Sequence, residues 1–491
     1  MVIVSIIFNG VYCCLLQKIR AFIMSMEHVF PSDTLLIKKT KPQVIWICLL
    51  AALAGLLFGL DIGVISGALP LIARQYGLID SQQEWVVSSM MIGAAAATLC
   101  SGFLAYRLGR KYALLIAAGA FCVGALICAG AVNPDMLILG RIILGIGLGV
   151  ASYATPLYLS EITPKHIRGA MISTYQLMIA LGILIVFLTN TAFSYSGNWR
   201  GMLLVVAIPS LIFLFGAFFL PRSPRWLMMH GRTEEARNVL IKLRSNMAEV
   251  DEEINEIKEQ LQVKQQGWQL FKENGNFRRT VSLGIFLQIM QQFSGVNVMM
   301  YYAPRIFHEI GFTSTTDQMW GTVIVGFAMT VATFIAVGFV DKWGRKPMLY
   351  IGFIIMGLAM TAVGTLLDGE ALSVLGRGIT VTMLLLFIIG FSMSAGPLIW
   401  LLCSEIQPLK GREFGITCST FTCHIAGMLV SASFLSLLNS LGSSNTFYLY
   451  ASLNAVALLV IYLFVPETKN ISLEQIEKNL MSGKKLRDIG Q

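Results

Sequence analysis

Two charged residues stand alone inside long uncharged stretches of this chain. Asp61 is the only charged residue between Val44 and Ala73, and Arg141 is the only one in the run LILGRIILGIGLG. A charge at the centre of a bilayer costs roughly 2.5–3.5 kcal/mol, so it usually has a partner and a function. A helical rise of about 1.5 Å per residue places both residues at similar depths, and we expect them to pair.

Burial favours the neutral form of the Asp61 carboxyl, whereas a neighbouring guanidinium favours the charged form. A change in surroundings therefore shifts the balance between the two forms. We interpret the pair as a site that binds and releases a proton. The alternative is a static buried ion pair that fixes helix packing.

A second stretch, from residue 280 to 303, is rich in uncharged polar side chains. They are Gln288, Gln291, Gln292, Asn297, Tyr301 and Tyr302. Amides and hydroxyls both donate and accept hydrogen bonds, which suits a neutral ligand covered in hydroxyl groups. The alternative is that these side chains hold neighbouring helices together.

The composition indicates a membrane protein that crosses the bilayer many times. The chain has 491 residues, of which 56% are hydrophobic and 13% charged, and its mean hydropathy is +0.71. A soluble domain has about 25% charged residues. The net charge of +9 does not indicate a nucleic-acid partner, because Lys and Arg lie in short loops between apolar runs.

The other chemistry-bearing residues give no catalytic or metal-binding pattern. The 9 cysteines lie mostly in apolar runs, and the sequence has no CxxC motif and no His/Cys pairing at metal spacing. We therefore expect no metal and no cofactor. We also expect no enzyme activity, because no cluster of His, Asp and Glu shares one face.

Twelve apolar segments are long enough to span a bilayer. They are approximately 44–73, 85–105, 113–132, 136–158, 171–193, 202–220, 280–303, 319–340, 348–367, 378–402, 414–438 and 446–465. Lys and Arg concentrate in alternate loops, which places both termini in the cytoplasm.

These segments divide the chain into two halves of six spans. The expected parts are an N-terminal cytoplasmic segment 1–43, a six-helix bundle 44–220, a cytoplasmic helical linker 221–279, a second bundle 280–465 and a cytoplasmic tail 466–491. The apolar stretch at the start is short for a span. We expect residues 1–23 not to be translated, with Met24 or Met26 rather than Met1 as the start. The alternative is that this stretch forms a thirteenth span.

The two halves repeat each other in order and spacing. RLGRK from Arg107 recurs as KWGRK from Lys342, and SEI from Ser160 recurs as SEI from Ser404. PRSPR from Pro221 and PETK from Pro466 close the two halves. Such six-plus-six repeats are typical of transporters that rock two bundles around a central site. The glycines of GIGLGV at 145–150 lie in a span and are expected to allow close helix approach rather than nucleotide binding.

These motifs, with LYLSE, QQFSGVN, GPLIW and SEIQP, resemble the sugar porters of the major facilitator superfamily from about residue 44 to the end. The resemblance implies an all-α membrane fold of 12 helices in two six-helix pseudo-repeats. It implies proton-coupled uptake of a monosaccharide across a bacterial inner membrane, with galactose or glucose ahead of arabinose and xylose. Its partners would be sugar, proton and lipid bilayer, and we expect a functional monomer. The alternatives are an uncoupled facilitator and a sugar sensor that does not transport.

The resemblance also implies roles for individual residues. Asp61 would bind the coupling proton opposite Arg141. The sugar ligands would be Gln176, Gln291, Gln292, Asn297, Tyr301 and Trp400, with Phe58 and Gly396 lining the pocket. A cytoplasmic gate of ion pairs would contain Glu161, Arg168, Glu405, Arg412, Arg107, Arg110, Asp341 and Arg345, with Lys111 and Lys346 beside them. Tyr106 stands at the position that matches Asp341, so the first half is expected to latch differently.

One departure from the family pattern affects the pocket. Related porters place Asn or Gln followed by Trp in the eleventh span, where this chain has Cys423 and His424. An amide donor and an aromatic wall are both missing. His424 either touches the substrate or is structural, and the change leaves the identity of the sugar open.

Overall fold

The structure is a computed structural model in which residues 41–164, 167–261, 267–368, 373–469, 471 and 473–490 are described. The side chains of residues 260, 337–342 and 474 are not described. The expectations for the start of the chain, including residues 1–23 and the choice of Met1, Met24 or Met26, lie outside the described residues.

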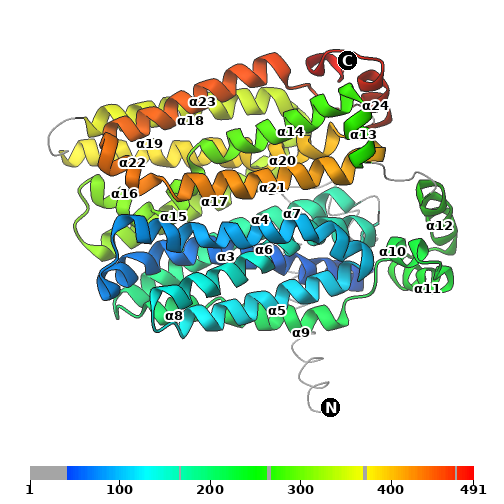
Figure 1. Ribbon diagram of the computed structural model, residues 1–491, viewed down its shortest axis with the longest axis horizontal. Coiled ribbons are helices and arrows are strands. Elements are labelled where there is room, and N and C mark those ends of the chain that lie inside the picture. The colour runs from blue at the N-terminus through cyan, green and yellow to red at the C-terminus, as the bar shows by residue number, and fades with distance from the viewer. Residues whose placement is uncertain are drawn as a thin grey trace, which may run out of the picture.

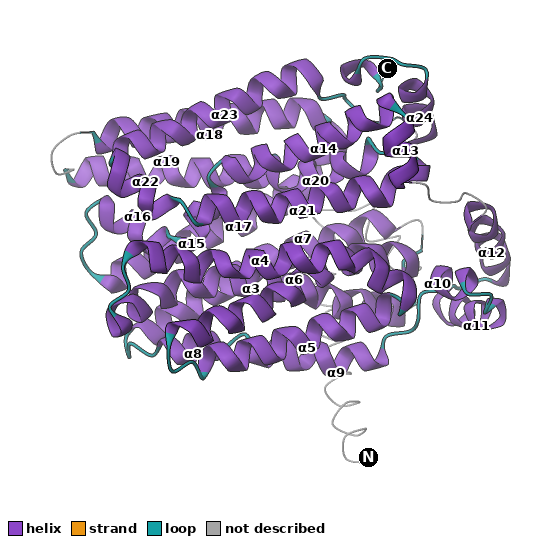
Figure 2. Cartoon of the chain, in the orientation of Figure 1, coloured by secondary structure: helices purple, strands orange, loops and turns teal. Residues whose placement is uncertain are grey.

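The described chain is built from helices joined by short loops, and it contains no strand (Figure 2). The first six predicted spans are the helices α3 (Pro42–Tyr76), α4 (Asp80–Arg107), α5 (Arg110–Ala129), α6 (Pro134–Ile162), α7 (Arg168–Ser194) and the pair α8 (Trp199–Leu204) and α9 (Ala207–Phe219). They lie together in the lower half of Figure 1.

The last six predicted spans form a second group, which lies in the upper half of Figure 1. They are α14 (Gly275–Phe293) with α15 (Val296–Tyr301) and α16 (Ala303–Glu309), α17 (Thr315–Trp343), α18 (Arg345–Leu367), α19 (Val374–Met393) with α20 (Ala395–Glu405), α21 (Arg412–Ser431) with α22 (Phe434–Leu441), and α23 (Ser443–Phe464). The predicted fold of 12 spanning helices is confirmed.

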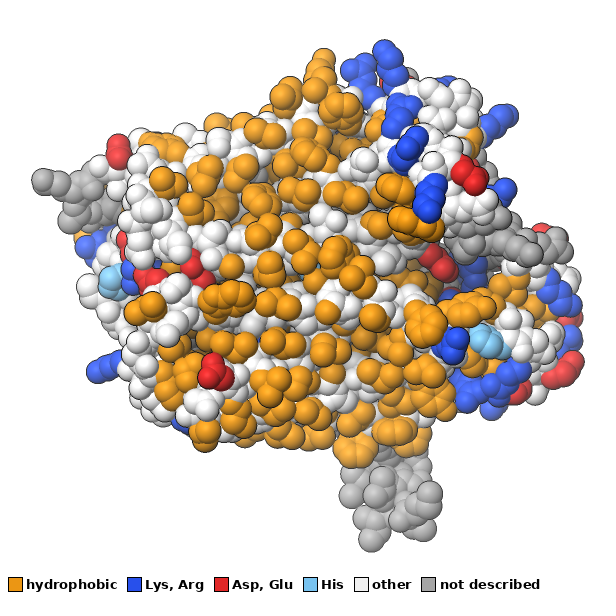
Figure 3. Space-filling view, viewed as in Figure 1, with side chains coloured by type: hydrophobic (Ala, Val, Ile, Leu, Met, Phe, Trp, Pro, Cys, Tyr) orange, Lys and Arg blue, Asp and Glu red, His pale blue; other side chains and the backbone are white. Residues whose placement is uncertain are grey.

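The remaining helices lie at one end of the molecule. They are α10 (Pro224–Met229), α11 (Thr233–Leu243), α12 (Met247–Leu261), α13 (Gly267–Glu273) and α24 (Leu473–Met481), followed by the short 3-10 turn η3 (Leu486–Asp488), while η2 (Leu409–Gly411) precedes α21. We call this end the linker end and the opposite end, with α8, α16 and α22, the loop end (Figure 1). Lys and Arg gather at the linker end, and hydrophobic side chains cover the visible surface between the two ends (Figure 3).

Eleven segments of the described chain are long and apolar enough to cross a membrane. The seventh span is not among them, because α14 carries the buried amides Gln288, Gln291 and Gln292 and ends at Phe293. The chain then turns at Gly295, whose φ of 98° is a left-handed conformation that glycine adopts without strain. This break separates α14 from α15 and places polar backbone inside the second bundle.

Glycines in α3 set its contact with α7. Gly55, Gly59, Gly63 and Gly67 recur every fourth residue and therefore share one face of the helix. A Cβ atom added at Gly59 would overlap the carbonyl of Ile179, so only glycine allows the two backbones to lie this close. The backbone of α3, which carries Asp61, is thereby held directly against α7.

The predicted role of the GIGLGV glycines is confirmed. Cβ atoms added at Gly145 and Gly149 would overlap the carbonyls of Met90 and Ala94, so α6 lies close against α4. The start of α6 is set by Asn133, whose side chain accepts a hydrogen bond from the Met136 amide at 2.8 Å, with Pro134 in the first turn. These features fix the depth and rotation at which α6 presents Arg141.

The two helix groups touch through a few elements. In the described chain, α4 packs on α21, α7 on α17, and α3 on α15 and α16. The Thr330 hydroxyl donates to the Ala180 carbonyl at 3.2 Å, and the Trp320 indole lies 3.4 Å from the Tyr195 hydroxyl. The contacts of α16 with α3 and of α22 with α4 lie at the loop end, so the two groups touch there.

Candidate functional site

Asp61 and Arg141 meet as expected, in the interior of the first helix group. Asp61 Oδ1 lies 3.9 Å from Arg141 Nη1, and both side chains are fully buried. Arg141 Nη2 donates to the Val87 carbonyl at 3.1 Å. Neither Asp61 oxygen accepts a hydrogen bond from any described residue. The contact is therefore an attraction across a long distance, without the hydrogen bonds that make a buried ion pair stable.

The amides of the seventh span form a hydrogen-bonded cluster with two other spans. Gln291 Nε2 donates to the Ala395 carbonyl at 2.7 Å and to the Gly396 carbonyl at 3.2 Å, at the break between α19 and α20. Gln292 Nε2 donates to Gln291 Oε1 at 3.3 Å, and Asn297 donates to Gln292 Oε1. Four of the predicted ligand and pocket residues therefore lie together: Gln291, Gln292, Asn297 and Gly396.

The other predicted ligand and pocket residues lie on four helices, of which α3 and α7 belong to the first group and α15 and α20 to the second. Phe58 on α3, Gln176 on α7 and Trp400 on α20 are all partly exposed. Tyr301 on α15 is 1% exposed, and its hydroxyl makes no hydrogen bond with any described residue. A buried hydroxyl without a partner is costly, and a ligand that bonds to it would remove that cost.

The two unusual residues of the eleventh span face different partners. Cys423 joins the amide cluster, with its Sγ 3.1 Å from Gln292 Nε2 and 4.0 Å from Gln291 Oε1. His424 Nδ1 lies 3.1 Å from the hydroxyl of Thr98 on α4, in the other helix group. The Thr98 hydroxyl also lies 2.8 Å from the Ala94 carbonyl of its own helix. His424 thus links the two groups in this conformation.

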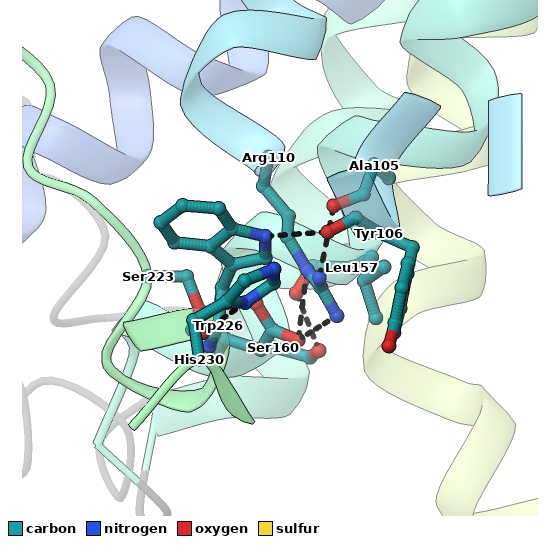
Figure 4. A network of polar contacts seen from close by, with 9 residues as sticks. Ala105, Tyr106, Arg110, Leu157, Ser160, Ser223, Trp226 and His230 are labelled. Carbon is teal, nitrogen blue, oxygen red and sulfur yellow. Dashed lines mark hydrogen bonds and ion pairs between the residues drawn. The ribbon is translucent and has the colours of Figure 1, made fainter. Parts of the chain in front are cut away.

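An ion-pair network stands at the linker end of the first group (Figure 4). Arg110 at the start of α5 donates to Glu161 Oε1 from Nε at 3.2 Å and from Nη2 at 2.9 Å. The Ser223 hydroxyl donates to Glu161 Oε2 at 2.5 Å. The Trp226 indole N–H donates to the Tyr106 carbonyl at 2.7 Å, and the His230 ring lies 4.3 Å from the Trp226 ring. These bonds tie α4, α5 and α6 to the linker. The bond at Tyr106 uses the backbone carbonyl, so the expectation that this half latches differently through the side chain at this position stays a prediction.

The second group carries a corresponding set of an arginine, a glutamate and a hydroxyl. Arg345 Nη2 lies 3.2 Å from Glu405 Oε1, and the Thr468 hydroxyl donates to Glu405 Oε2 at 2.5 Å. Glu467 accepts hydrogen bonds from the backbone amides of Arg345 and Lys346, each at 3.0 Å, and so caps the start of α18. The repeat seen in the sequence is thus a repeat in three dimensions.

The remaining predicted gate residues lie around these networks at the linker end. Arg107 is exposed and stacks over the Phe103 ring at 5.0 Å. Arg168 and Arg412 begin α7 and α21. Asp341 lies near the end of α17, and its side chain is outside the described part. The ion pairs of Glu161 and Glu405 form within each helix group and do not join the two.

Two residues of these networks, Ser223 and Thr468, are marked in the sequence only by the repeat that closes each half. Ser223 and Thr468 each stand two residues after the proline that closes a half, so the repeat of PRSP and PETK was the available clue. Arg244 donates to both oxygens of Glu253, at 2.7 and 2.8 Å, and to the Ile162 carbonyl at 2.9 Å. It thereby connects the linker to the end of α6, and no motif marked it.

Residues 47–480 match the family described as "Sugar (and other) transporter". The chain is 58% identical over 453 residues to the galactose-proton symporter of Escherichia coli strain K12, covering 92% of this chain and 98% of that protein. It is 52% identical over 458 residues to the arabinose-proton symporter of the same strain, covering 92% of this chain and 97% of that protein.

Solved structures show the same arrangement of helices. The xylose transporter XylE from Escherichia coli, in a partially occluded inward-open conformation, superposes with a TM-score of 0.78 at 30% identity, covering 88% of this chain and all (100%) of that one. The proton:xylose symporter XylE bound to 6-bromo-6-deoxy-D-glucose gives a TM-score of 0.75 at 32% identity, covering 89% of this chain and 98% of that one.

Proposed function

The chain belongs to the sugar transporter family of the major facilitator superfamily, and on that basis we propose that it imports a monosaccharide together with a proton. The observation that carries the proposal is the 58% identity to a galactose-proton symporter across 92% of the chain. Galactose or glucose is the proposed substrate, and arabinose and xylose are the alternatives that the other relatives suggest.

Asp61 is the proposed site of the coupling proton. In this structure its carboxylate is buried with only the distant charge of Arg141 to balance it. A proton on Asp61 would remove the buried negative charge and free Arg141 from it, since no hydrogen bond holds the two together. The charge state of Asp61 would thus bias how α3 and α6 pack, and proton binding would be linked to conformation.

The amide cluster is the proposed sugar site. Gln291, Gln292 and Asn297 offer donors and acceptors that a sugar hydroxyl can satisfy, and they lie beside the breaks in the seventh and tenth spans. Phe58, Gln176, Tyr301 and Trp400 would complete the pocket from the surrounding helices. His424 reaches the substrate only in a conformation where its bond to Thr98 is broken.

Alternating access is the proposed mechanism, with 44–220 and 280–465 as the two rocking bundles. The Lys and Arg residues at the linker end support a cytoplasmic position for that end by the positive-inside rule, and both termini and the linker 221–279 would then be cytoplasmic. The bacterial inner membrane is the proposed location, with the single chain as the functional unit. The networks around Glu161 and Glu405 would belong to the cytoplasmic gate, because they stand at the linker end and bind the ends of the spans to Ser223 and Thr468, which lie outside the spans.

The test is the external pH of de-energised cells that express the chain. Addition of galactose, then arabinose, then xylose should make the medium alkaline for the transported sugar, because each sugar that enters removes a proton from outside. Equilibration of labelled sugar without alkalinisation would mean an uncoupled facilitator. Binding without uptake of any of the three sugars would favour a sensor.

A further inference from the structure

The loop end of the molecule holds a carboxylate from one helix group against the start of a helix in the other. The eleventh span is broken after Ser431, so α22 begins anew at Phe434. The first amide N–H groups of a helix have no partner within the helix. Glu84 of α4 supplies the acceptors: the Ser436 amide donates to its Oε1 at 2.7 Å, and the Ser436 hydroxyl donates to its Oε2 at 2.8 Å.

This contact is more favourable than an ordinary surface bond. Glu84 is 4% exposed, and its negative charge faces the positive end of the α22 dipole. Hydrogen bonds to an ionised acceptor are roughly twice as strong as neutral ones. If the groups separate, a buried carboxylate and the first turn of α22 both lose these partners. Each helix group is therefore incomplete at this point without the other.

Neighbouring contacts join the same parts of the molecule beside Glu84. The Tyr302 hydroxyl, at the end of the broken seventh span, donates to the Ser431 carbonyl at 2.7 Å, and its ring lies 5.2 Å from that of Phe434. Asp80, one turn from Glu84 on α4, accepts a hydrogen bond from Asn439 Nδ2 at 2.7 Å. The breaks in the seventh and eleventh spans and the start of α4 thus meet at one place.

We propose that Glu84 is a gating residue: its bonds to Ser436 form when the loop end closes and break each time it opens toward the outside. The proposal rests on the alternating access put forward above. In this proposal, Glu84 of the first helix group caps the start of α22 in the second group. The first turn of α22 therefore has its hydrogen-bond acceptors only in the closed state. Removing the carboxylate should therefore move the equilibrium toward the state that is open at the loop end.

The test measures the separation of the two groups directly. Spin labels at Val132, 73% exposed after α5, and Val374, 87% exposed at the start of α19, report the width of the loop end. Cys100 and any other cysteine that takes label are replaced by serine. Pulsed electron paramagnetic resonance then gives the ratio of long to short distances for the parent and for Glu84→Ala, Glu84→Gln and Ser436→Ala.

Glu84→Ala should raise the ratio of long to short distances by about tenfold or more, and Glu84→Gln by less, because the amide still accepts one bond. Ser436→Ala removes only the hydroxyl donor and should shift the ratio in the same direction by a smaller factor. It keeps the proposal testable if Glu84→Ala does not fold. Glu309→Gln is the matched control, because Glu309 accepts a hydrogen bond from Ser443 at 2.9 Å at the same end but within one group.

Unchanged distances in folded Glu84→Ala and Ser436→Ala would overturn the proposal, as would an equal shift in Glu309→Gln. The readout does not depend on which sugar is carried or on a proton. A chain that fails the alkalinisation test but shows the predicted shift would refute the proposed symport while leaving the gate in place.

Discussion

At the scale of single residues, Asp61 is a buried carboxyl group whose burial is energetically unfavourable and for which we propose a function. Its carboxylate lies 3.9 Å from Arg141 Nη1 and accepts no hydrogen bond from the described residues. A buried pair kept only for stability would be expected to have short, direct hydrogen bonds, since these offset the loss of hydration. The long contact instead suits a carboxylate that alternates between a proton and a guanidinium.

Asp61→Asn should abolish alkalinisation and sugar accumulation against a gradient, while labelled sugar still exchanges across the membrane. The amide is neutral and close in size, so it imitates the protonated acid permanently. Uptake with and without an imposed proton gradient measures the effect. Asp135→Asn, an exposed carboxylate at the start of α6, is the control and should accumulate sugar normally. Accumulation by Asp61→Asn would instead make the pair a static packing element.

Cys423 is the second residue whose type should affect transport, through the KM for the sugar. Its thiol faces Gln292 in the amide cluster, where related porters carry an amide. Cys423→Asn should lower KM for the transported sugar by about two- to tenfold, the worth of one added hydrogen bond. Cys423→Ser keeps the size of the thiol without adding an amide and should not tighten binding. Sugar uptake at varied concentration measures KM, and an unchanged or higher KM in Cys423→Asn would contradict a place for this residue in the pocket.

At the scale of elements, close backbone contact decides how the spans pack. The glycines of α3 allow it to lie against α7, and those of α6 allow it to lie against α4. Small residues at such interfaces are typical of membrane helices. The hydrophobic effect does not drive helices together within lipid, so they associate through close van der Waals packing. The same contacts hold the helices that carry Asp61 and Arg141.

Gly59→Val should destabilise the protein by at least about 1–3 kcal/mol, because the added side chain overlaps the backbone of α7 rather than a side chain that can move. A lower melting temperature and less monodisperse protein in detergent would show it. Gly119→Val is the matched control, since a Cβ atom at Gly119 of α5 meets nothing within 4 Å. Equal melting temperatures of the two variants would contradict the packing explanation.

At the scale of the whole molecule, the two halves use the same network with different degrees of burial. The side chains of Arg110 and Glu161 are 6% and 3% exposed, whereas those of Arg345 and Glu405 are 11% and 15% exposed. Removing one partner of a buried pair leaves an uncompensated charge, and water compensates that charge better where it is more exposed.

Glu161→Ala should therefore lower the free energy of unfolding by about 3–5 kcal/mol. Glu405→Ala should lower it by clearly less, although both changes remove a bond from an arginine and one from a hydroxyl. Thermal unfolding of the two variants, side by side with the parent, measures the difference. A larger effect of Glu405→Ala would mean that the C-terminal network carries more of the stability than its exposure indicates.

The sequence by itself determined the parts of this protein that depend on composition and periodicity. Long apolar runs gave twelve spans because a bilayer demands helices of that length, and their repeat indicated two related halves. The isolated charges Asp61 and Arg141 had to meet, because each is too costly to bury alone. The amides of the seventh span had to face inward for the same reason, and they do so as a cluster.

Only the tertiary structure decided which partners distant residues take. Glu84 and Ser436 lie in different halves, and nothing in either local stretch indicates that one caps a helix of the other. His424 bonds to Thr98 rather than to the amides beside Cys423, because adjacent residues of one helix point in directions about 100° apart. The ion pairs of Glu161 and Glu405 form within each half, since the folding of each bundle brings its own arginine nearest. Pairing across the interior depends on packing angles and helix breaks, and these arise only when all the spans assemble.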